Sequence, residues 1–172
     1  MAGWSPEIAN EFIRLGERDG VAFTHMQLQK LVYIAHGWNL AVNGASLTKD
    51  APQAWEFGPV YREIWEALRG CGQTPVTRLI ANGDFALGSF AERVDDPAKA
   101  SLSKVESDVV KKVYEDYRHF HAYQLSALTH AEGTPWTVVY DNGNGKSAQI
   151  SSDLIEKYFV NLARTRREKA PA

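Results

Sequence analysis

The spacing of apolar residues along the chain predicts a mainly helical fold. In most segments apolar positions recur every three to four residues, which places them on one face of a helix. Seven such segments are bounded by residues typical of helix starts and stops. The predicted helices cover approximately residues 5–20, 24–43, 58–70, 103–119, 122–130, 134–140 and 151–166.

The start signals agree with the apolar periodicity. Ser5 is expected to cap the first helix with Pro6 at its first helical position, because proline is tolerated there and serine is a favoured N-cap. Thr24 and Gln27 fit a capping box for the second helix. The N-cap residues, the apolar faces and the helix-ending residues agree with one another, which strengthens the helical interpretation.

The second predicted helix differs from the others because it is apolar almost all round. Only a strip around Lys30 and Gly37 interrupts its apolar residues, which are Leu28, Leu31, Val32, Tyr33, Ile34, Ala35, Trp38 and Leu40. A helix of this kind is surrounded by neighbours. We therefore predict that it lies at the centre of the domain.

Two stretches are less regular. Residues 47–57 look extended, with a short strand at 53–57 that could pair with a second one at 76–80, and Gly58-Pro59 is expected to start the third helix. Residues 73–102 contain several helix breakers. The predicted fold is mainly α, with six or seven helices around a central buried helix and room for one short β pair. It forms a single compact domain over 1–166, followed by a short, basic, frayed tail at 167–172.

Composition narrows the functional classes. The 172 residues are 44% hydrophobic and 23% charged, which is ordinary for a globular protein. A net charge of −2 gives no general attraction to nucleic acid. Cys71 is the only cysteine, which excludes an intrachain disulfide. Neither a secretory signal nor an apolar run of membrane-spanning length is visible, so we expect a cytoplasmic chain without membrane contact.

The histidines do not form a recognisable reactive group. His25 and His36 are about three helical turns apart, which is too far for one metal ion. His119 and His121 point in different directions on a helix. His130 has no nucleophile or carboxylate placed beside it by the sequence. We therefore predict no catalytic residue, no metal site and no cofactor.

Aromatic residues are a more informative feature. Five tryptophans and seven tyrosines are present, and several lie near predicted loops. Large aromatic side chains are frequent anchors of protein interfaces, although packing in the core is the default role for any single one. The residues that we select as candidates for partner binding are Trp55, Phe57, Tyr61, Trp65, His130 and Trp136.

Three ordered motifs carry a resemblance to a known family. They are the segment 28–38 (LQKLVYIAHGW), the segment 54–61 (AWEFGPVY), and Leu128-Thr129-His130 followed by Pro135-Trp136; Ile155 and Phe159 on the last helix complete the pattern. Together they resemble the Panacea antitoxin domain, also described as SocA-like or phage-associated GepA-like, over about residues 5–165. The spacer 131–134 is longer than expected, and 73–102 shows no family feature.

The resemblance implies an antitoxin that neutralises a cognate toxin by direct protein binding. In a SocA-like branch it further implies a proteolytic adaptor that delivers the toxin to an AAA+ protease such as ClpXP. The expected partners are therefore a toxin and such a protease. Two alternatives remain open on the residues alone: a nucleic-acid-binding regulator that uses the basic residues of 164–169, and a small hydrolase that uses His36 and His130.

The motif residues also have an architectural interpretation. We expect Gln29, Lys30, Trp38, Gly58 and Pro59 to serve structure, because they belong to the predicted core helix and to the start of the next one. Lys30 is the polar exception on the core helix. We hypothesise that it pairs with a buried carboxylate such as Glu56, which would attach the extended segment to the core.

Overall fold

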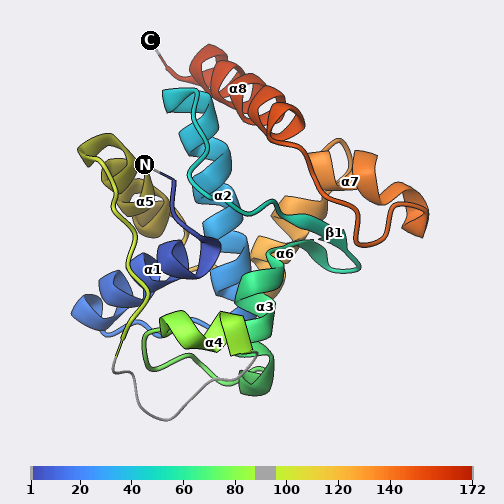
Figure 1. The fold of residues 1–172 in the computed structure, drawn as a ribbon. Coiled ribbons are helices and arrows are strands. Elements are labelled where there is room, and N and C mark those ends of the chain that lie inside the picture. The colour runs from blue at the N-terminus through green and yellow to red at the C-terminus, as the bar shows by residue number, and fades with distance from the viewer. Residues whose placement is uncertain (1, 88–95, 172) are drawn as a thin grey trace.

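A computed structural model describes residues 2–87 and 96–171 and shows a mainly helical protein (Figure 1). Within these residues the chain forms eight α-helices: α1 Ser5–Asp19, α2 His25–Asn43, α3 Arg62–Leu68, α4 Asn82–Leu87, α5 Lys104–Tyr117, α6 Ala122–His130, α7 Pro135–Tyr140 and α8 Ser152–Lys169. Short 3-10 turns follow α3 (Arg69–Cys71) and α7 (Asp141–Gly143). One antiparallel pair joins β1 Gln53–Trp55 to β2 Gly58–Val60. The predicted fold class is confirmed.

Helix α2 lies at the centre, as predicted. It packs against α1, α5, α6, α8 and β2, and Figure 1 shows it passing between them. Residues on every side of α2 are fully buried, including Leu28, Leu31 and Lys30. Burial of its large apolar side chains, at roughly 1.5–3 kcal/mol each, makes this helix a large contributor to hydrophobic stabilisation.

The predicted capping box of the second helix is present. Thr24 and Gln27 form the capping box of α2, with the Thr24 amide donating to Gln27 Oε1 at 2.8 Å. At α1 the predicted cap is wrong by one residue, because Trp4 is the N-cap. Ser5 instead donates through its amide (2.7 Å) and its hydroxyl to the carboxylate of Asp50. Its side chain is therefore engaged in a long-range contact.

The predicted pairing of 53–57 with 76–80 is wrong. β1 pairs with β2 in a tight hairpin, with Gln53 opposite Val60 and Trp55 opposite Gly58. Gly58-Pro59 therefore does not start a helix. Gly58 has a φ of +109°, a value that suits glycine in a turn and is incompatible with a right-handed helix. α3 begins at Arg62.

The segment predicted to be irregular is attached to the core by one buried polar side chain. Asn10 of α1 donates to the carbonyls of Ile80 (2.8 Å) and Ala98 (2.7 Å), and its Oδ1 accepts from the Ile80 amide. Val76 bonds to Phe23 through its amide, which explains why it is not available to β1. Helix α4 in this segment was not predicted, and residues 88–95 lie outside the described residues.

The last helix extends further than the predicted range 151–166. α8 continues to Lys169, so the first three residues of the predicted tail are helical. The Arg166 guanidinium lies 4.9 Å from the centre of the Trp38 ring, which attaches this end of α8 to α2. Among the described residues, no helix is both long enough and apolar enough to span a membrane.

Close approach of α8 to α2 depends on Gly37. A Cβ atom placed there would overlap the ring of Phe159, which also packs edge-on against Trp38 at 5.2 Å between ring centres. The polar strip predicted around Gly37 is therefore a groove for an aromatic ring. The room that glycine leaves for this ring matters more for stability than the low helix propensity of glycine.

We predict that Gly37→Ala destabilises the protein by about 1–2 kcal/mol, since the overlap with Phe159 puts the cost of overpacking in the upper part of its usual range, at about 2–3 kcal/mol, against a gain of about 1 kcal/mol from alanine in a helix. Gly70→Ala is the matched control, because no atom lies within 4 Å of its Cβ position. It should change the free energy of unfolding by less than about 0.5 kcal/mol. Urea denaturation measures both; equal stabilities of the two variants would contradict the packing role of Gly37.

Candidate functional site

The β1–β2 hairpin is attached to α2 by the side-chain amide of Gln29. The Tyr61 amide donates to Gln29 Oε1 at 2.8 Å, and Gln29 Nε2 donates to the Tyr61 carbonyl at 3.1 Å. Both main-chain groups of Tyr61 are thus satisfied by one buried side chain, as by a neighbouring strand. Gln29 Nε2 also lies 3.2 Å from His25 Nε2. Burial and the nearby Lys30 charge lower the pKa of His25 to about 4.

Lys30 provides the second attachment. It is fully buried, and its Nζ donates to the Pro59 carbonyl at 2.8 Å. A side chain at Gly58 would place its Cβ 3.0 Å from this nitrogen, so glycine leaves room for the lysine. Burial lowers the pKa of Lys30 to about 7. The predicted pair with Glu56 is wrong, because Glu56 is exposed at the hairpin turn and the hydrogen-bond acceptor is a carbonyl.

Helices α6 and α7 hold the turn from another side. Ser126 Oγ of α6 donates to the Phe57 carbonyl at 2.7 Å, and Trp136 Nε1 of α7 donates to the Trp55 carbonyl at 2.7 Å. Since the serine hydroxyl has one hydrogen, His130 Nδ1, 3.2 Å from Ser126 Oγ, must be the donor in that contact. The hydrogen-bonded imidazole of His130 has its ring centre 5.3 Å from that of Trp136, and the two rings cover this side of the turn.

The outer edge of β1 is paired with the loop before α8. The Ala54 amide donates to the Ala148 carbonyl at 2.8 Å, and the Ser147 amide donates to the Ala54 carbonyl at 2.7 Å. The Ile150 amide donates to the Pro52 carbonyl at 2.8 Å. The hairpin is consequently bonded to α2, α6, α7 and this loop, and it presents its turn to solvent.

The six partner-binding candidates fall into four groups. Phe57 is 62% exposed at the turn. Trp55 and Trp65 are half-buried beside each other, with ring centres 5.5 Å apart. Tyr61 is fully buried and belongs to the core. The remaining two, Trp136 (9% exposed) and His130, lie under the turn and support it.

His36 occupies a different environment. It is buried, and its Nδ1 accepts from the amides of Leu47 and Thr48, both at 3.3 Å. Burial lowers its pKa to about 4, so the ring is neutral with its hydrogen on Nε2. His36 and His130 therefore have separate hydrogen-bond partners. In the ranges 2–87 and 96–171, no group of three or more histidine, cysteine, aspartate or glutamate side chains could hold a metal ion.

Two residues with important contacts were missed from the sequence. Ser126 was not selected, although it holds the turn, because its partner Phe57 lies 69 positions away in the chain. Asp50 accepts from Ser5 in a partly buried position, where burial and Glu63 raise its pKa to about 7. The sequence held a signal for Ser126, which is a polar residue within an apolar helical stripe. It held no such signal for Asp50.

The lowered pKa of Lys30 gives a pH dependence with a definite sign. Between the folded pKa of about 7 and the ordinary value of 10.5, the unfolded chain binds more protons than the folded one. We therefore predict that the free energy of unfolding rises with pH in this window, by about 1 kcal/mol per unit. Below pH 7, lysine is charged in both states and contributes no slope.

Denaturation across the window tests this. Lys30→Met should remove the slope, whereas Lys104→Met, which replaces an exposed lysine, should keep it. An unchanged slope in Lys30→Met would show that another group titrates.

Comparisons with known proteins identify the family of the chain. The family profile "Antitoxin SocA-like, Panacea domain" matches residues 28–137, which include most of α2, the hairpin, α6 and the start of α7. The protein "Antitoxin SocA" of Caulobacter vibrioides (strain NA1000 / CB15N) is 26% identical over 150 residues, covering 87% of this chain and 77% of that protein. No solved structure shows a significant match. The chain thus belongs to the family of SocA-like antitoxins with a Panacea domain.

Proposed function

We propose that this protein is the antitoxin of a toxin–antitoxin pair and neutralises its cognate toxin by direct binding, without catalysis, through the exposed turn of the β1–β2 hairpin. The observation that carries the proposal is the contrast at this turn. Phe57 is 62% exposed, while the main chain around it is hydrogen-bonded to Ser126, Trp136, Gln29 and Lys30. An exposed aromatic side chain on a fixed support is typical of an interface anchor.

The hydrogen bonds that hold the hairpin turn in place favour high affinity for a partner. Ordering a flexible loop on binding costs free energy, and a loop already held in its bound geometry avoids that cost. Trp55 and Trp65 add half-buried aromatic surface to the hairpin, and the Arg69 guanidinium lies 5.2 Å from the Trp65 ring centre. A mixed aromatic and cationic surface of this kind matches the composition that is enriched at protein interfaces.

We further propose that the protein delivers its toxin to an AAA+ protease such as ClpXP in the cytoplasm. The resemblance to SocA-like antitoxins supports this step. The test is the half-life of the toxin in cells with and without the protein. A toxin that is degraded equally fast in its absence would contradict delivery but leave neutralisation by binding intact.

Phe57→Ala should abolish neutralisation without unfolding the protein. An exposed phenylalanine contributes little to the stability of the fold. Loss of an interface anchor lowers the binding free energy by about 2 kcal/mol or more, which raises the dissociation constant at least about 30-fold. Co-expression with the toxin encoded by the neighbouring gene measures growth rescue, and co-purification measures binding.

Val42→Ala is the matched control, since Val42 is 64% exposed at the end of α2 and lies outside the hairpin. It should rescue growth as the native chain does. Equal rescue by Phe57→Ala would contradict the assignment of the hairpin turn as the toxin contact, and no rescue by the native chain would contradict the antitoxin proposal itself.

A further inference from the structure

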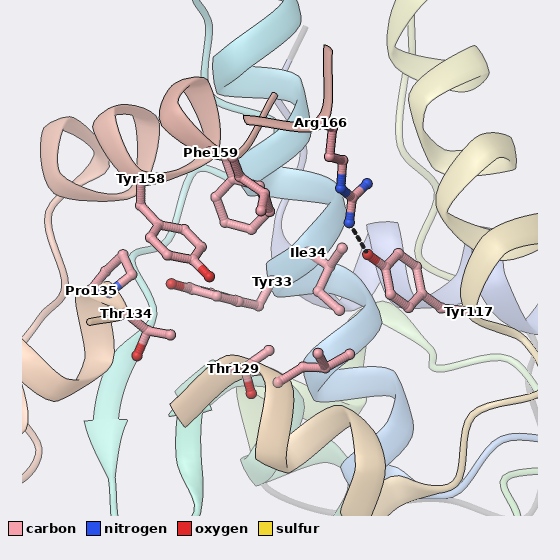
Figure 2. A pocket seen from close by; sticks show the side chains of 11 residues that line it. Tyr33, Ile34, Tyr117, Thr129, Thr134, Pro135, Tyr158, Phe159 and Arg166 are labelled. Atoms are coloured by element: carbon pink, nitrogen blue, oxygen red, sulfur yellow. Dashed lines mark hydrogen bonds between the residues drawn. The ribbon is translucent and has the colours of Figure 1, made fainter. Parts of the chain in front are cut away.

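A small pocket of about 120 Å³ opens between α2, α5, α6, α7 and α8 (Figure 2). Its wall is mostly apolar and aromatic. The residues that line it are Tyr33, Ile34, Tyr117, Leu128, Thr129, Thr134, Pro135, Tyr158, Phe159, Leu162 and Arg166. Tyr33 and Ile34 come from the first sequence motif, and Thr129 and Pro135 come from the third.

The size of the pocket restricts what can occupy it. Sites for cofactors and drug-sized molecules usually measure about 300–1,000 Å³. A cavity of about 150 Å³ with apolar walls accommodates one benzene ring. The pocket therefore has the dimensions of a single aromatic side chain and is too small for a nucleotide or a flavin.

One polar atom in the pocket is unsatisfied. The Tyr33 side chain is buried, at 2% exposure, and its hydroxyl has no hydrogen-bond partner within the described parts of the chain. Figure 2 shows the Tyr33 ring crossing the pocket with its hydroxyl directed toward Thr134 and Pro135. Buried hydroxyl groups are normally paired, so each exception needs an explanation. An occupant that carries a hydroxyl group would supply the missing partner.

The rim of the pocket favours an occupant with a negatively charged group, and helix α6 connects the rim to the hairpin. Among the described residues that line the pocket, Arg166 alone is charged, and its guanidinium lies 3.3 Å from the Tyr117 hydroxyl (dashed in Figure 2). Leu128 of α6 is 47% exposed. Because α6 also holds the hairpin turn through Ser126, one helix connects the pocket to the proposed toxin-binding surface.

We propose that this pocket receives one tyrosine side chain of the toxin, next to an acidic residue that pairs with Arg166. The phenol ring fills the apolar space, and its hydroxyl exchanges a hydrogen bond with Tyr33. An acidic neighbour follows from charge complementarity at the rim. The inference rests on the proposed antitoxin function and adds a second anchor point to the hairpin turn.

The pocket can be tested without the toxin. p-Cresol reproduces the tyrosine side chain and toluene lacks its hydroxyl, so both are titrated into the native protein while amide chemical shifts are followed by NMR. We expect saturable shifts around α2, α6 and α8, with p-cresol bound about fivefold more tightly, which is the contribution of one hydrogen bond. Tyr33→Phe should remove this preference while toluene still binds.

Leu162→Trp fills the pocket and should abolish binding of both probes and co-purification of the toxin. Asn161→Trp places the same side chain at the neighbouring exposed position of α8 and should preserve both. Absence of shifts in the native protein, or a Leu162→Trp variant that still co-purifies with the toxin, would overturn the pocket assignment while the antitoxin proposal stands. A native protein that binds p-cresol but no toxin would instead overturn the proposed function, and with it the toxin as occupant.

Discussion

The structure depends on two adjacent side chains of α2, Gln29 and Lys30, that reach from the central helix to the main chain of the hairpin. They bond to Tyr61 and Pro59, in a region from which water is excluded. A hairpin that passes over a core helix would otherwise leave main-chain donors and acceptors unsatisfied, which is costly. Polar residues therefore occupy the most buried helix of the protein because the hairpin requires hydrogen-bond partners there.

This arrangement connects packing to the proposed function. With α2, α6, α7 and the 147–150 loop all bonded to it, the hairpin holds Phe57 in the solvent on a support that the hydrophobic core stabilises. The pocket beside Tyr33 lies against the same two helices, α2 and α6. The two surfaces can thus act as separate anchor points on a rigid frame, which favours affinity because little ordering is needed on binding.

The sequence was sufficient for seven of the eight helices in the described residues, but it missed α4 and the start of α3, and it was not sufficient for the contacts between helices. Thr24, Ser103 and Thr134 mark helix starts through local capping, so their role is readable from neighbouring residues. Gly58-Pro59 was misinterpreted because the same pair suits a helix start and a strand beside a tight turn.

The long-range contacts gave weaker signals. Lys30 was recognised as exceptional, but nothing local indicates that its partner is a carbonyl and not a carboxylate. Asn10 and Ser126 bond to groups 69 to 88 residues away, which no periodicity reveals. Among the candidate aromatic residues, exposure separated Phe57 from Tyr61, and exposure depends on how the hairpin folds onto α2.

We infer that the hairpin is part of the core and not a mobile loop. Hydrogen exchange of the Tyr61 amide in the isolated protein tests it most directly, because this amide donates to Gln29 Oε1. We expect the Tyr61 amide to be protected as strongly as the α2 amides and to exchange only through global unfolding. Exchange of the Tyr61 amide at the rate of an open loop, while α2 stays protected, would contradict it.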